Sequence, residues 1–283
     1  MNFKEYLTAA WSLHMTDPKK VADEIKQNFN LMESDDDVMA ITRLIVHVCG
    51  EHLGDWTKGI ELLRKLKNNA TIKDPAEVNR YMAILTLGNN PNESIENFKD
   101  SDQVIIYASV ASALTSLGGI KNAEKFLTLA AQISRTQLNK DDPALRALAT
   151  SCNSMIRTLE NKMESTPHEI QLMILAAKTA RHFWELVGTW KDFQKAEYRL
   201  AHTYLKAQLL DESLYHAKLC LEINSKNGDG PLELFFAYEV LAMVEKAKGN
   251  TAANSQAVER MRMIFKGLSV EDQIKCKESL AKV

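Results

Sequence analysis

The sequence predicts an all-α fold, a solenoid of antiparallel helical hairpins, on three observations. The chain of 283 residues contains only 11 Gly and 6 Pro, too few for a sandwich, a barrel or an alternating βαβ fold, each of which needs many tight turns. Apolar residues recur with helical spacing, and no segment keeps the two-residue period of a strand for long. The gaps between the helical segments are very short, so consecutive helices must pack antiparallel.

Start and stop signals divide the chain into about fourteen helices of roughly 10–20 residues. Thr166-Pro167 places a capping residue before a proline in the first turn, and the acidic run after Ser34 favours a helix start because it complements the helix dipole. Gly118 and Gly249 lie where helices should end. The fourteen expected helices cover residues 2–14, 18–33, 35–53, 55–68, 75–87, 91–99, 102–117, 120–137, 144–162, 168–187, 191–208, 211–224, 231–248 and 251–267, and residues 270–281 are a candidate for one more.

The best candidate for a domain boundary is a polar seam at residues 139–143 (Asn-Lys-Asp-Asp-Pro). We therefore expect an N-terminal helical-hairpin array over residues 1–142 and a C-terminal array over residues 143–283. The seam contains no Gly/Ser tract and is short, so the second array is expected to continue directly from the first.

Small and aromatic residues return at similar offsets in separate hairpins. In one copy Tyr107 is followed by Gly118, Ala123 and Ala130. The corresponding residues of a later copy are Leu200, Ala201, Tyr204, Ser213 and Cys220. These residues resemble the tetratricopeptide repeat (TPR), a 34-residue helix–turn–helix module, although Gln208 stands in place of the turn glycine in the later copy. The resemblance implies a right-handed, TPR-like α-solenoid.

In such a solenoid the first helix of each hairpin lines a concave groove, and the resemblance places a partner-binding groove on two first helices of the C-terminal array. The candidate groove residues are Tyr198, His202, Leu205, Lys206, Phe236, Glu239, Met243 and Lys246. Their mixture of aromatic, apolar and charged side chains suits a peptide that needs apolar anchors and a polar frame. The alternative is that Tyr198 and Phe236 are buried between hairpins as core residues. The Lys and Asn pair by which some members of the family bind acidic C-terminal tails is missing.

Charge and cysteine content limit the partners and the compartment. The net charge is −2, whereas nucleic-acid binders usually carry a basic excess, so no nucleic acid is expected. The longest uncharged stretch, residues 103–120, is too polar for a membrane span, and we expect no membrane partner. Four cysteines without a CxxC pair favour reduced thiols and a cytoplasmic protein. A homodimer is compatible with the sequence.

No motif points to catalysis or to a cofactor. The sequence lacks a GxGxxG loop, a GxSxG elbow and an HExxH helix, so we expect no catalytic residue and no enzyme. The densest group of ligand-type residues is His47, Cys49, Glu51 and His52. On an α-helix only His47 and Glu51 of this group share a face, and two ligands make a weak site, so no metal is expected.

We therefore expect a non-catalytic protein- or peptide-binding scaffold. One alternative is a regulatory protein whose groove senses a peptide or a small ligand. The other is an enzyme with an unrecognised site, which a deep pocket with a buried His182 or His202 beside a carboxylate would favour.

Overall fold

The computed structural model describes residues 2–69, 75–228 and 230–282. The described residues contain fourteen α-helices and two short helices of other types, and no β-strand. The predicted all-α fold is confirmed. The chain divides into two compact units, residues 1–151 and 152–283.

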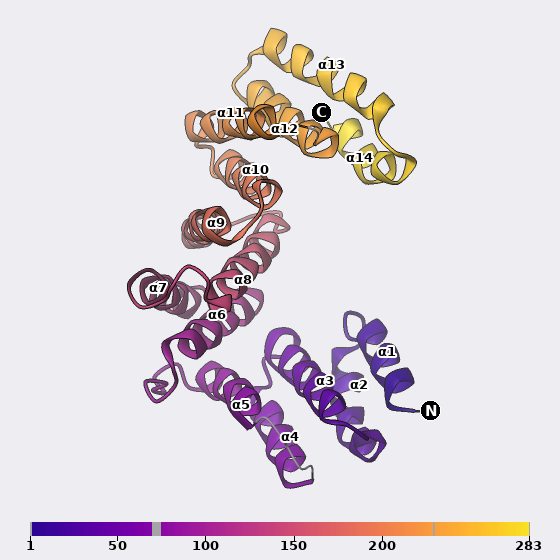
Figure 1. Ribbon diagram of the computed structural model, residues 1–283, viewed down its shortest axis with the longest axis vertical. Helices are drawn as coiled ribbons and strands as arrows, with labels where there is room; N and C mark the ends of the chain where they lie inside the picture. Colours follow the sequence, from indigo (N-terminus) through magenta and orange to yellow (C-terminus); the bar gives the residue numbers. More distant parts are fainter. Residues whose placement is uncertain (1, 70–74, 229, 283) are drawn as a thin grey trace. The chain divides into compact units, whose positions relative to one another are not determined.

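The N-terminal unit begins with short and irregular helices and continues with longer hairpins (Figure 1). Its elements are α1 (Phe3–Leu13), α2 (Pro18–Glu24), the 3-10 helix η1 (Ile25–Leu31), α3 (Asp35–Ile45), the π-helix η2 (Val46–His52), α4 (Trp56–Asn69), α5 (Pro75–Asn89), α6 (Asp100–Ser116), α7 (Ile120–Thr136) and the first half of α8 (Pro143–Glu160). Helix α6 packs most extensively on α7, and α5 packs on both α4 and α6.

The C-terminal unit is a regular series of hairpins. After the second half of α8 it contains α9 (Pro167–Val187), α10 (Trp190–Lys206), α11 (Leu210–Asn227), α12 (Pro231–Ala247), α13 (Thr251–Gly267) and α14 (Val270–Lys282). Each helix from α9 to α13 packs on the next one, and α10 also contacts α12 (Figure 1). The first helices of neighbouring hairpins are therefore in contact, as in a solenoid of stacked hairpins.

The helix expected over residues 91–99 is wrong, because the segment after α5 forms turns. The carbonyl of Asn90 accepts a hydrogen bond from the Glu93 N–H at 3.0 Å, and the Asn90 side chain accepts one from the Asn92 N–H at 3.2 Å. Asn and Pro favour such local turns over a helix. The single helices expected over 18–33 and 35–53 are also each divided in two, because η1 and η2 interrupt the α-helical hydrogen bonding.

The helix starts follow the capping signals of the sequence. Ser34 accepts a hydrogen bond from the Asp37 N–H at 3.2 Å, while the Asp37 carboxylate accepts one from the Ser34 N–H at 3.1 Å. Thr166 and Glu169 form the same reciprocal box at the start of α9. Each box satisfies backbone N–H groups that the first turn leaves without a partner.

Three hairpins share one turn geometry. Gly118, Gln208 and Gly249 have φ values of +80°, +59° and +77°, and in each turn the next residue donates its N–H to a carbonyl five residues earlier, at 2.8–2.9 Å. This pattern closes the end of a helix with a left-handed residue. Gln208 therefore occupies the place of the turn glycine in structure as well as in sequence.

Small residues are buried within these hairpins. Ala123 and Ala130 of α7 are completely buried, as are Ser213 and Cys220 of α11. The Ser213 hydroxyl donates to the carbonyl of Ala201 on the facing helix α10 at 2.7 Å. A hydroxyl can reach a neighbouring backbone in this way only where two helices approach closely.

The division between the two units falls inside α8, which runs without a break from Pro143 to Glu160. The boundary expected after Asp142 stays a prediction, because a division within a continuous helix does not by itself mark the end of a domain.

Candidate functional site

Half of the candidate groove residues form one contact cluster on α10 and α12. The Tyr198 hydroxyl donates a hydrogen bond to Oε2 of Glu239 at 2.7 Å. The Tyr198 ring packs edge-on against His202, with 4.6 Å between ring centroids, and against Phe236, with 5.7 Å. Helical spacing explains the convergence, because Tyr198 and His202 lie four residues apart on one helix face. We refer to these four residues as the Tyr198 cluster.

The remaining candidates have different roles. Leu205 is half-buried and packs with the core formed by α10, α11 and α12. Lys206 donates from Nζ to the carbonyls of Leu159, Glu160 and Lys162 at 2.7–2.9 Å, so it neutralises the C-terminal end of α8.

The last two candidates lie on α12. Met243 is half-buried and Lys246 is exposed. The structure thus brings Tyr198, His202, Phe236 and Glu239 together, whereas Lys206 is held within the unit.

Burial shapes the electrostatics of the Tyr198 cluster. Burial raises the pKa of Tyr198 well above its ordinary value of 10.0, and the Glu239 carboxylate adds to the rise. Burial also lowers the pKa of His202 to about 4, with a smaller contribution from the Arg199 cation. At neutral pH the cluster therefore contains a neutral phenol and a neutral imidazole beside a buried carboxylate.

Two polar atoms near the Tyr198 cluster have no hydrogen-bond partner among the described residues. They are Nε2 of His202 and Oε1 of Glu160, both buried. The other carboxylate oxygen of Glu160 lies 3.5 Å from the Arg199 guanidinium, and burial raises the pKa of Glu160. Buried polar atoms without partners are unfavourable, so these two groups cost stability in the folded unit.

A pocket of about 180 Å³ adjoins the Tyr198 cluster between α10 and α12. Tyr198 and Phe236 supply its aromatic wall, and Lys195 and Arg199 supply positive charge. Its full lining is Gln194, Lys195, Tyr198, Arg199, Leu232, Glu233 and Phe236. Tyr198 and Phe236 were predicted from the sequence. The other lining residues were missed because they lie beside the predicted groove positions of α10 and α12.

Another ionic cluster of the C-terminal unit is internal. The Arg181 guanidinium binds Glu197 at 2.7 Å and Glu185 at 2.8 Å, and Glu197, which is fully buried, also contacts Nδ1 of His216 at 2.6 Å. These partners satisfy one another across α9, α10 and α11. These ion pairs give Arg181 and Glu185, the charged neighbours of His182, a structural role.

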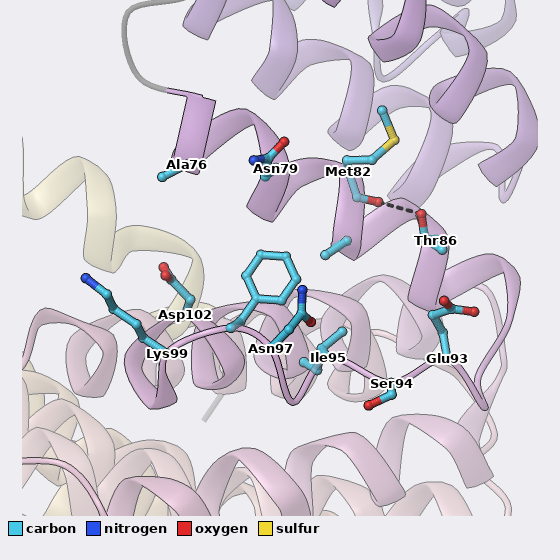
Figure 2. Close-up of a pocket in the computed structure, with 12 residues that line it drawn as sticks. Ala76, Asn79, Met82, Thr86, Glu93, Ser94, Ile95, Asn97, Lys99 and Asp102 are labelled. Atoms are coloured by element: carbon cyan, nitrogen blue, oxygen red, sulfur yellow. Dashed lines mark hydrogen bonds between the residues drawn. The ribbon is translucent and has the colours of Figure 1, made fainter.

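Figure 2 shows a larger pocket, of about 540 Å³, in the N-terminal unit. Asn79 and Met82 of α5 lie on one side, and Ile95 and Asn97 of the irregular segment lie on the other. Asp102, which lines the pocket, forms an ion pair with Arg80 at 2.6 Å. The pocket exists because residues 91–99 are not helical, which the sequence did not predict. Its described lining residues contain no buried polar atom without a partner.

Comparisons with known proteins give the fold class. No family profile matches the sequence, and no curated protein does. The structure is similar to a kinesin light chain-like protein of Podosopora anserina with nearly identical TPR-like repeats, at a TM-score of 0.50 and 13% identity, covering 82% of this chain and 97% of that chain. It is also similar to BtubC (BKLC) from P. vanneervenii, at a TM-score of 0.51 and 15% identity, covering 94% of this chain and 92% of that chain.

The chain is therefore a helical-repeat protein with a TPR-like fold, and the resemblance inferred from Tyr107, Gly118 and the later copy is confirmed at the level of fold. Within the described residues, none of the helices has the length and hydropathy that crossing a membrane requires.

Proposed function

We propose that this protein is a non-catalytic scaffold that binds a protein or peptide segment on the α10–α12 face of its C-terminal unit. The observation that carries the proposal is the pocket of about 180 Å³ beside the Tyr198 cluster. Cofactor and small-molecule sites usually occupy about 300–1,000 Å³, whereas an apolar cavity of about 150 Å³ holds a single benzene ring. The pocket thus fits one apolar side chain of a partner better than a whole cofactor.

The lining of the pocket indicates what kind of segment would bind. The rings of Tyr198 and Phe236 are an apolar wall for an anchor residue, while Lys195, which is exposed, and Arg199 favour a carboxylate next to that anchor. We expect an aromatic or aliphatic residue adjacent to Asp or Glu.

The proposal is tested by selecting peptides from a random display library on the full chain. We expect a consensus of one apolar and one acidic residue, and Lys195→Glu should weaken the selected peptides about tenfold or more. The matched control is Lys218→Glu, which makes the same charge change at an exposed position of α11. The proposal fails if no consensus emerges or if both variants bind alike.

The cytoplasmic location belongs to the same proposal. All four cysteines are buried and free of disulfide bonds, which is the usual state in a reducing compartment. The homodimer stays a prediction, to be checked by the mass of the purified chain in solution.

A further inference from the structure

Three histidines of the N-terminal unit converge on one point. His14 directly follows α1, and His47 and His52 lie in the π-helix η2. One ring nitrogen from each lies within 4.8 Å of the others, and the ring centroids are separated by 4.6–5.2 Å. This group is distinct from the proposed peptide site, which lies in the other unit.

The π-helix creates this convergence. On an α-helix, His47 and His52 would point about 140° apart, because each residue turns by about 100°. In η2 the hydrogen bonds run over five residues, and the last one joins the Leu53 N–H to the Val48 carbonyl at 3.1 Å. Residues five apart then share a face. His47 and His52 therefore meet, with 3.0 Å between their Nε2 atoms.

Two of the three imidazoles are oriented through their other ring nitrogen. Nδ1 of His47 contacts the Glu51 carboxylate at 2.9 Å, and Nδ1 of His14 contacts the carbonyl of Trp11. Metal-binding histidines typically donate this second nitrogen to a carboxylate or a backbone carbonyl, which fixes the ring and leaves a lone pair on the other nitrogen. In both residues that other nitrogen is Nε2.

We propose that His14, His47 and His52 bind one Zn²⁺ ion. The group that could hold an ion consists of three imidazoles, with the Glu51 carboxylate held on the second nitrogen of His47, and imidazole ligands favour zinc over magnesium or calcium. Zn–N bonds of about 2.0–2.1 Å in a tetrahedron place ligand nitrogens about 3.3 Å apart. The His47–His52 pair is already close to that distance, and His14, at the end of its helix, has to move its side chain inward.

Three protein ligands leave the fourth zinc position open. All three histidines are only half-buried, so solvent reaches the site and a water molecule completes the tetrahedron. The bound ion would connect the end of α1 to η2 and hold the first helix on its unit. The competing explanation is a metal-free cluster in which one ring N–H of the His47–His52 pair donates to the other ring.

The experiment is a metal titration of the full chain after treatment with a chelator. We expect one equivalent of Zn²⁺ to bind, and Co²⁺ to give the visible absorption of a tetrahedral site. His14→Gln, His47→Gln and His52→Gln should each weaken binding at least about tenfold, and Glu51→Gln, which touches only the second nitrogen of His47, by about 10–100-fold. The control is His168→Gln, an exposed histidine of the other unit, which should leave the affinity unchanged.

Several outcomes would overturn the site. No binding at micromolar Zn²⁺ would mean a hydrogen-bonded histidine cluster only. Equal binding by the wild type and the triple histidine variant would place the metal elsewhere, and X-ray absorption would then show sulfur at about 2.3 Å in place of nitrogen at about 2.0 Å if the cysteines were responsible. Circular dichroism monitors folding; should the η2 variants unfold, His14→Gln decides, because His14 lies outside the helix body.

Discussion

In the C-terminal unit each helix from α9 to α13 packs on the next, and two of its hairpins share one turn geometry. The N-terminal unit has that turn once and interrupts other helices with η1 and η2. The regular unit places the first helices α10 and α12 side by side, so side chains from matching positions, such as Tyr198 and Glu239, meet. The irregular unit instead changes the direction of single side chains, and three histidines meet as a result. In this protein the regular repeat forms a surface shared by neighbouring helices, whereas a local departure from the repeat brings a few side chains together at one site.

In the N-terminal unit the Trp56 ring packs closely against η2 and α5. Trp56 begins α4 and is 8% exposed. A Cβ added to Gly50 in η2 would lie 2.9 Å from the Trp56 ring, and one added to Gly88 in α5 would lie 2.5 Å from it. The indole therefore fits against two backbones that carry no side chain at these points.

The largest effect that we predict follows from removing the Trp56 ring. Trp56→Ala should cost about 3–5 kcal/mol of unfolding free energy, because it leaves a cavity between η2 and α5. Chemical denaturation followed by circular dichroism measures the change. Met15→Ala, at a residue that is 69% exposed in the same unit, is the control and should change little. Equal stability of both variants would show that the η2 region is not packed as described.

The matching change in the regular unit concerns the Tyr198 cluster. Tyr198→Phe keeps the ring and removes the hydroxyl, which donates a hydrogen bond to Glu239 at 2.7 Å. Glu239 is only 5% exposed. We expect a cost of about 1–3 kcal/mol, since a buried carboxylate loses a donor. Tyr215→Phe, at a 61% exposed tyrosine, should be neutral. If the two variants denature at the same midpoint, the Tyr198–Glu239 bond does not stabilise the hairpin contact.

A third prediction concerns pH. Burial, with a smaller effect of Arg199, lowers the pKa of His202 to about 4 in the folded chain, against about 6.5 when unfolded. The unfolded chain therefore takes up the proton first, and the His202 contribution is complete above pH 6.5 and is lost as the pH falls toward 4. The ring of His202 packs against Tyr198 on the same helix, and Arg199, which contributes to the lowered pKa of His202, lies 3.5 Å from the Glu160 carboxylate.

The comparison of wild type and His202→Gln isolates this effect from the other titrating groups. By pH 4.5 the wild type should have lost about 1–3 kcal/mol more than the variant, relative to pH 7.5. Denaturation midpoints at both pH values provide the measurement. Parallel pH profiles would indicate that His202 is solvated and would remove it from the buried cluster.

The sequence predicted most of the helices of the regular C-terminal unit. Thr166 marks the start of α9 through short-range hydrogen bonds, and the candidate groove residues were expected on two neighbouring first helices, α10 and α12, which are in contact. The role of Lys206 could not be predicted, because its three acceptors lie at the end of α8, more than forty residues earlier in the chain. A contact of that kind depends on how helices stack.

The histidine cluster was missed for a different reason. His47 and Glu51 were expected to share a face, and they are in contact at 2.9 Å. The expected position of His52 assumed α-helical geometry, whereas η2 is a π-helix, and His14 follows a different helix, α1. A π-helix is rare, and an apolar pattern interpreted with α-helical spacing does not reveal it.

The smallest predicted effect concerns the shared turn, where Gln208 has a φ of +59° in the place that Gly249 occupies at +77°. A left-handed conformation costs an L-residue about 1–2 kcal/mol, and glycine loses about 0.5–1 kcal/mol in backbone entropy. Gln208→Gly should therefore stabilise the C-terminal unit by about 0.5–1 kcal/mol, which thermal denaturation would detect. Gly249→Ala is the converse test, because a Cβ there meets no atom within 4 Å and any loss of stability must come from the backbone. If Gln208→Gly destabilises the protein while Gly249→Ala does so as well, the Gln208 side chain itself contributes a contact, and the two turns are equivalent in backbone geometry but not in energy.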